Sequence, residues 1–91
     1  MWSEELQKMT IKYFGEVGET MLKAVVKGKY TFALGFDGNL FITDKAKALI
    51  PDSEKNKRYF IFDMDDSRKP TAFIKAYDFI EDLVRDGWAI D

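Results

Sequence analysis

The chain of 91 residues, with 46% hydrophobic and 33% charged residues, has the length and composition of one globular domain. Its formal net charge is −2, and it contains neither histidine nor cysteine. These absences exclude a histidine-based catalytic triad, a thiol nucleophile, a disulfide framework and an ordinary structural zinc site.

The N-terminal segment carries the apolar stripe of an amphipathic helix that starts after Ser3. Apolar residues recur at steps of three and four: Leu6, Met9, Tyr13, Val17, Met21 and Ala24. Ser3 is suited to cap the start of this helix, and Gly28 is suited to end it. Gly15 and Gly18 oppose a continuous helix, because each costs about 1 kcal/mol relative to alanine. The pattern therefore leaves two alternatives for residues 19–26, helix or strand.

Two β-prone runs surround Asp37-Gly38-Asn39 and predict a β-hairpin with its turn there. A three-residue loop would place one set of apolar residues on a shared face: Phe32, Leu34, Phe36, Leu40 and Ile42. After this hairpin, Asp44 is expected to cap a short helix that runs through Ile50 and ends at Pro51. The sequence PDSEKNKR is then predicted to be a solvated loop.

A third strand is predicted at residues 58–64, followed by a second long helix after the sequence DSRKP. The strand residues expected to face the core alternate with their neighbours: Phe60, Phe62 and Met64. The helix is indicated by apolar residues at three- and four-residue steps, Phe73, Tyr77, Ile80 and Val84, with Ile74 and Leu83 beside them. It is expected to stop at Asp86-Gly87, beyond which Trp88 can fold back over Leu83.

The predicted order is helix, strand, strand, short helix, strand, helix. This order is typical of an α+β domain in which an antiparallel sheet of about three strands packs against the two longer helices. Residues 1–91 contain no repeat or linker and are predicted to form a single compact domain. The sequence also lacks a membrane-spanning apolar run and a signal-peptide pattern, so a cytoplasmic location without membrane contact is expected.

Three carboxylates, Asp63, Asp65 and Asp66, come at the end of the third predicted strand, after its run of aromatic and aliphatic residues. The Asp-x-Asp pattern resembles the first motif of haloacid dehalogenase-like phosphatases, which implies Asp63 as the nucleophile and Asp65 as the acid/base. Only 28 residues follow Asp63, too few for the later motifs of that family, and the assignment is rejected. A calcium loop is rejected as well, because Arg68 stands where a glycine is required. Weak Mg²⁺ binding remains an alternative, but acids that end a strand and cap the next turn are the favoured interpretation.

Two further charged sets are candidates for partner contacts. The first is basic and lies between residues 45 and 58: Lys45, Lys47, Lys55, Lys57 and Arg58. A solvated loop is favoured over a nucleic-acid site there, because no aromatic residues are interleaved and the strand rings are expected in the core. The second set is acidic and lies near the C-terminus: Asp78, Glu81, Asp82, Asp86 and Asp91. It suits a basic partner or imitation of a phosphate backbone, although a solubilising helix face is the simpler interpretation.

The function predicted from these observations is that of a small acidic, non-enzymatic domain that binds another protein. In length, charge and lack of motifs the chain is similar to phage- and mobile-element-encoded inhibitors of host systems, including anti-CRISPR proteins. Such a protein would act by steric blocking of a host protein or a nucleoprotein complex. A homodimer is an alternative, and neither a direct nucleic-acid ligand, a metal nor a cofactor is expected.

The residues predicted to contact the partner combine the two acidic clusters with one tryptophan: Asp63, Asp65, Asp66, Asp78, Glu81, Asp82, Asp86 and Trp88. Trp2, Trp88 and Ile90 lie near the chain ends, where they either pack on each other or serve as exposed anchors. Two other functions stay open at this stage. One is ligand or metal binding at Asp63, Asp65 and Asp66, and the other is nucleic-acid binding through residues 45–58.

Overall fold

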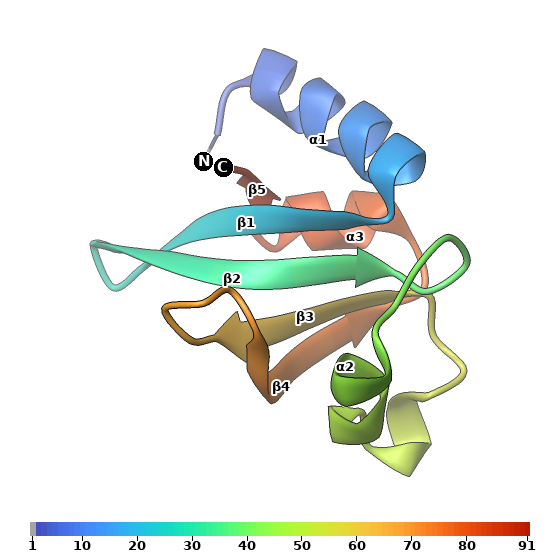
Figure 1. Ribbon diagram of the computed structural model, residues 1–91. Coiled ribbons are helices and arrows are strands. Elements are labelled where there is room, and N and C mark those ends of the chain that lie inside the picture. Colours follow the sequence, from blue (N-terminus) through green and yellow to red (C-terminus); the bar gives the residue numbers. More distant parts are fainter. Residues whose placement is uncertain (1) are drawn as a thin grey trace.

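The computed structural model describes residues 2–91 as an α+β fold with one five-stranded antiparallel sheet (Figure 1). The elements in chain order are α1 (Glu4–Val17), β1 (Glu19–Val26), β2 (Lys29–Asp37), α2 (Asp44–Leu49), a 3₁₀ turn η1 (Asp52–Glu54), β3 (Tyr59–Met64), β4 (Pro70–Tyr77), α3 (Ile80–Arg85) and β5 (Ala89–Ile90). The strand order is β4-β3-β2-β1-β5. The predicted class is therefore confirmed, whereas the predicted three strands are five. Within residues 2–91, every helix is too short or too polar to cross a membrane.

Helices cover both faces of the sheet, and each face has its own apolar cluster. The face under α1 and α3, here the α1/α3 face, buries Phe14, Leu22, Ala24, Ala33, Tyr59, Ile61, Tyr77, Ile80, Leu83, Val84 and Trp88. The opposite face, here the α2 face, buries Leu34, Phe36, Ala46, Ile50, Phe60, Phe62 and Ala76. Phe60 and Phe62 face a core as predicted. Because β3 is central and covered on both sides, its other residues Tyr59 and Ile61 are buried too, which the predicted single core face did not include.

The first helix begins as predicted and ends at Val17, ten residues before the predicted end at Lys27. The Ser3 hydroxyl accepts a hydrogen bond from the Leu6 amide at 3.1 Å. Gly18 has a φ of 74° and donates to the Phe14 carbonyl at 3.4 Å, which closes the helix in a left-handed C-cap. Residues 19–26 therefore form a strand, the second of the two predicted alternatives.

Two hairpins join consecutive strands, β1 to β2 and β3 to β4. The turn of the first lies at Lys27-Gly28, and neither hairpin has its turn at residues 37–39. Both turn residues have positive φ, 52° for Lys27 and 79° for Gly28, as a two-residue type I′ turn requires. The predicted hairpin at residues 37–39 is wrong, because the chain leaves the sheet after Asp37. Residues expected to continue as a strand, including the exposed Leu40, instead lead into α2.

The crossover between β2 and β3 is fixed by a buried carboxylate. Asp37 is fully buried, and its two oxygens accept from Nε and Nη2 of Arg58, both at 2.9 Å. Asp37 also accepts from the Asn39 amide at 3.0 Å, which shapes the turn that leaves the sheet. Within the crossover, Thr43 rather than Asp44 caps α2, since its hydroxyl accepts from the Ala46 amide at 3.2 Å.

The predicted C-terminal helix is wrong over residues 70–77, which form the edge strand β4. Two bulges explain the error. Neighbouring residues Ile61 and Phe62 of β3 pair with Lys75 and Phe73 of β4, so Ile74 between them has no partner on β3. Thr71 is left without a partner in the same way. Each bulge breaks the alternation of a strand and produces the spacing of three and four that indicates a helix. Only the last part of the predicted helix, Ile80–Arg85, is helical.

The two ends of the described chain pack against each other, beside β5 in Figure 1. The Trp2 indole donates to the Gly87 carbonyl at 2.7 Å. The Thr10 hydroxyl of α1 accepts from the Ile90 amide at 3.1 Å. Trp88 folds over Leu83 as predicted, and its side chain is only 8% exposed. Of the two alternatives for the chain ends, packing against each other or serving as exposed anchors, Trp88 therefore follows the first.

Candidate binding surface on the β1–β2 hairpin

The outer part of the β1–β2 hairpin extends beyond its neighbouring strands. β1 and β2 pair from Glu19 opposite Phe36 to Val26 opposite Lys29. Along this ladder β5 pairs with β1 only at Leu22 and Lys23. β3 pairs with β2 only over residues 34–37. Residues 24–33, here called the arm, therefore form a two-stranded ribbon within the described chain, and their turn projects at the left of Figure 1.

Large apolar side chains of the arm are exposed on the α2 face. Tyr30 is 65% exposed and Phe32 is 47% exposed. At every second position along β2 they share this face with the buried Leu34 and Phe36, and Val25 lies opposite Tyr30 on β1. The helix α2 packs against the β4 side of this face and leaves the arm uncovered. The same sheet face thus has a covered half and an open half.

Three aromatic rings form a row along the open half. The ring centroids of Trp2 and Tyr30 lie 6.1 Å apart, and those of Tyr30 and Phe32 lie 6.4 Å apart with planes only 12° from parallel. The Lys23 ammonium lies 5.0 Å from the Trp2 ring centroid. Because the Trp2 indole is also hydrogen-bonded to Gly87, one end of the row is held by the body of the domain.

The arm is the basic part of an acidic protein. Between residues 20 and 36 the only charged residues are Lys23, Lys27 and Lys29, in a chain whose net charge is −2. Lys27 and Lys29 stand at the tip and are exposed. An exposed aromatic row flanked by cations and free of carboxylates is suited to an anionic partner.

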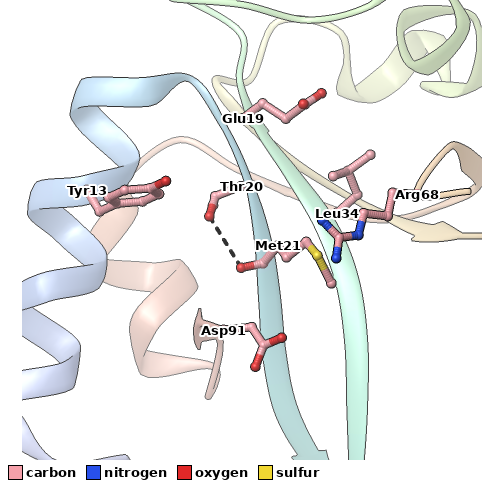
Figure 2. Close-up of a pocket in the computed structure, with 7 residues that line it drawn as sticks. All are labelled: Tyr13, Glu19, Thr20, Met21, Leu34, Arg68 and Asp91. Carbon is pink, nitrogen blue, oxygen red and sulfur yellow. Dashed lines mark hydrogen bonds between the residues drawn. The ribbon is translucent and has the colours of Figure 1, made fainter.

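A shallow hollow of about 320 Å³ continues this surface toward the other end of the hairpin (Figure 2). Its lining residues are Tyr13, Glu19, Thr20, Met21, Leu34, Arg68 and Asp91. Figure 2 shows Tyr13 on one side, Leu34 and Arg68 together on the other, and Met21 between the two sides. Met21 and Leu34 are the cross-strand pair that follows Lys23 and Phe32 in the ladder, so the hollow adjoins the aromatic row.

The hollow contains both signs of charge. Arg68 reaches it from the β3–β4 turn, where the residue has a φ of 60°, and forms no ion pair with any of the described residues. A neighbouring hollow shares Glu19, Leu34 and Arg68 and adds Lys45 and Lys69. Cations therefore line the wall formed by the turn and α2, and the carboxylates of Glu19 and Asp91 lie on the side of β1 and β5.

The acidic cluster after β3 supports a turn. The Asp65 carboxylate accepts from the amides of Ser67 at 2.8 Å and Lys69 at 3.0 Å, and these bonds lower its pKa. This is the capping role that the favoured interpretation predicts. Asp63 and Asp66 are exposed. In the part of the chain that the structure describes, no three His, Cys, Asp or Glu side chains are placed to hold a metal ion.

The predicted C-terminal contact residues are divided between structure and surface. Asp86 accepts from Lys75 at 2.8 Å and from the Tyr77 hydroxyl at 2.7 Å, and these hydrogen bonds lower its pKa. Burial and the Asp86 carboxylate raise the pKa of Tyr77. Asp82 pairs with Arg85 at 2.7 Å. Trp88 is buried and is not an exposed anchor, whereas the two remaining acids, Asp78 and Glu81, are exposed.

Much of the basic set at residues 45–58 is paired internally. Lys55 lies 3.2 Å from Asp52, and Lys57 lies 3.1 Å from Glu54. Arg58 is held by the buried Asp37, and the hydrogen bond between them raises the Arg58 pKa. These pairs leave Lys45 and Lys47 as the cations of this region that form no ion pair with a described residue.

Local sequence patterns do not reveal the arm, because they predict Gly28 as a helix cap and Phe32 as a core residue. Two signals were available: a lysine-glycine turn between β-prone runs, and the absence of acidic residues from 20 to 36.

Comparison with known protein families, curated proteins and solved structures finds no match to this chain.

Proposed function

We propose that this protein is a non-enzymatic binding domain that recognises another macromolecule through the arm. The observation that carries the proposal is the pair of exposed rings, Tyr30 and Phe32, on a basic hairpin whose outer edges are unpaired within residues 2–91. The half-buried Trp2 extends this row from the N-terminal side of α1. Clustered exposed apolar side chains mark interaction sites, and tyrosine and tryptophan are enriched where binding energy concentrates. An isolated two-stranded hairpin is also marginally stable in water, so a partner that covers the arm would stabilise it.

The charge of the arm favours an anionic partner surface. Its lysines would raise the association rate with such a partner and lower the rate with cationic surfaces. The sequence suggested that the protein blocks a host protein or a nucleoprotein complex. That hypothesis is compatible with this proposal if the arm makes the main contact with the blocked partner. The exposed acids Asp78 and Glu81 then form a separate, secondary surface for a basic group of the same partner.

Capture from a bacterial lysate with matched variants tests this proposal. Ser53 is exposed on η1, outside the arm, and the chain has no cysteine, so a Ser53→Cys version can be biotinylated at one position. Wild type should retain a partner that the Tyr30→Ala/Phe32→Ala variant does not. Phe79→Ala is the control, because Phe79 is 65% exposed but lies between β4 and α3.

The lysate is divided, and one half is treated with nuclease before capture. Loss of retention in the arm variant but not in the control supports the proposal in either half. Equal retention by wild type and the arm variant would contradict it. The nuclease step separates a protein partner from a nucleic-acid partner without affecting the first comparison.

A further inference from the structure

We propose that the arm binds single-stranded nucleic acid, with bases stacked on Tyr30 and Phe32 and phosphates near Lys23, Lys27 and Lys29. This inference rests on the proposed function and names the class of its partner. Proteins that bind single strands combine a basic surface with aromatic side chains on which successive bases stack. The arm provides both components within one hairpin.

The geometry of the rings suits stacking. Tyr30 and Phe32 are separated by one residue on the same strand, so both rings stand on the same side of the sheet. Their planes are within 12° of parallel, which allows neighbouring bases to stack on them in a similar orientation. Both rings are accessible, at 65% and 47% exposure. Trp2 extends the row to a third ring that is more deeply packed.

The distribution of charge favours a nucleic acid over an acidic protein. The hairpin has no carboxylate between residues 20 and 36, so every charged side chain of this segment is a cation. The carboxylates of Glu19 and Asp91 lie in the hollow at the opposite end of the hairpin. They limit the bound nucleic-acid strand to the arm and to the wall of the hollow that Arg68 lines. A protein partner would not require the flat, exposed and nearly parallel rings that stacking of bases requires.

The small size of the surface sets the expected strength and salt dependence. Two or three rings correspond to a short site, so affinity for a single arm should be weak. Three lysines near three phosphates predict a slope of log K against log salt of roughly −2, since each phosphate contributes about −0.7 on a single strand. Each of Lys27→Gln and Lys29→Gln should then reduce the magnitude of the slope by roughly 0.7.

The test is fluorescence anisotropy of a labelled 12-nucleotide oligo-dT and oligo-rU, titrated with protein at several salt concentrations. Wild type should bind both at low salt. Phe32→Ala should weaken binding roughly tenfold, and Tyr30→Ala likewise, as expected for loss of base stacking. Phe79→Ala should bind like wild type. Urea unfolding of each variant checks that the body of the domain stays folded.

Three results would overturn the inference. The first is no anisotropy change at low salt with millimolar protein, and the second is binding that Tyr30→Ala/Phe32→Ala leaves unchanged. The third is arm-dependent dimer formation in analytical ultracentrifugation that excludes the oligonucleotide, which would assign the arm to a second copy of the chain. If oligonucleotides do not bind but nuclease-treated lysate still gives arm-dependent capture, this inference fails while the proposed function stands.

Discussion

The two halves of the α2 face contain the same kinds of residue and differ in what lies above them. On the covered half, Phe36 and Phe62 contact each other edge to face under α2, with ring centroids 5.7 Å apart. On the open half, Tyr30 and Phe32 lie on the same strand as Phe36 and are exposed. The crossover of residues 38–58 covers one half and not the other. Position relative to the crossover, rather than residue type, therefore separates aromatic residues that stabilise the fold from those available to a partner.

The largest expected difference between the halves is in core stability. Phe62→Ala should lower the free energy of unfolding by about 3–5 kcal/mol, because it leaves a cavity between Phe36 and Phe73. Phe32→Ala should cost less than about 1 kcal/mol, because half of its side chain is already in water. Urea unfolding of both variants measures the difference. Similar losses for the two would show that the arm is part of the cooperative core.

The next effect concerns the ion pair that holds the crossover over the covered half. Arg58→Leu would leave Asp37 buried without its partner and should cost roughly 3 kcal/mol, the lower end for a broken buried pair since Arg58 is partly solvated. Lys57→Leu is the matched control, because its carboxylate partner Glu54 is 31% exposed whereas Asp37 is fully buried, and this pair should contribute less than about 1 kcal/mol. Thermal or urea unfolding distinguishes the two. A larger loss for Lys57→Leu would refute this account of the crossover.

A smaller effect is expected from a change confined to the arm. Gly28 has a φ of 79° and open space around its Cα, so Gly28→Ala introduces backbone strain without a clash. It should cost about 1 kcal/mol and act first on the arm. Amide hydrogen exchange should accelerate at residues 24–33 and change little at β3. Uniform acceleration across the sheet would show that the arm and the body unfold together.

The smallest effect is on the dependence of stability on pH. Hydrogen bonds from Lys75 and Tyr77 lower the pKa of Asp86 in the folded protein. Its contribution is therefore present above its unfolded pKa of about 4 and lost as the pH falls through the lower folded pKa. Wild type should exceed Asp86→Asn in stability at pH 7, and the gap should close as the pH falls through the lowered folded pKa of Asp86. Asp78→Asn, at an exposed acid, is the control and should be as stable as wild type at pH 7 and at acid pH. The arm has no carboxylate and should not contribute to this dependence of stability on pH.

Parts of the fold that depend on local signals were predictable from the sequence. Ser3 marks the start of α1, Pro51 follows the end of α2, and the alternation of Phe60 and Phe62 identifies β3. These features rest on caps, proline geometry and strand period, which need no knowledge of distant residues. The capping role of Asp65 was predictable for the same reason.

The features that were not predictable depend on tertiary structure. The bulges of β4 convert a strand pattern into a helical one, and only the pairing with β3 reveals them. Likewise, no local pattern distinguishes Phe32 from Phe36, because their burial depends on where the crossover lies. The candidate surface was missed for this reason, although the lysine-only charge of the hairpin was visible.

The unpaired edges of the arm also bear on solubility. An exposed strand edge with apolar side chains is a template for pairing between molecules, and natural proteins often protect such edges with lysine. Lys27 and Lys29 stand at the tip, where mutual repulsion would keep the arms of different molecules apart at low ionic strength. Neutralising these two side chains should therefore promote aggregation at high protein concentration well before it alters the thermal midpoint of dilute samples.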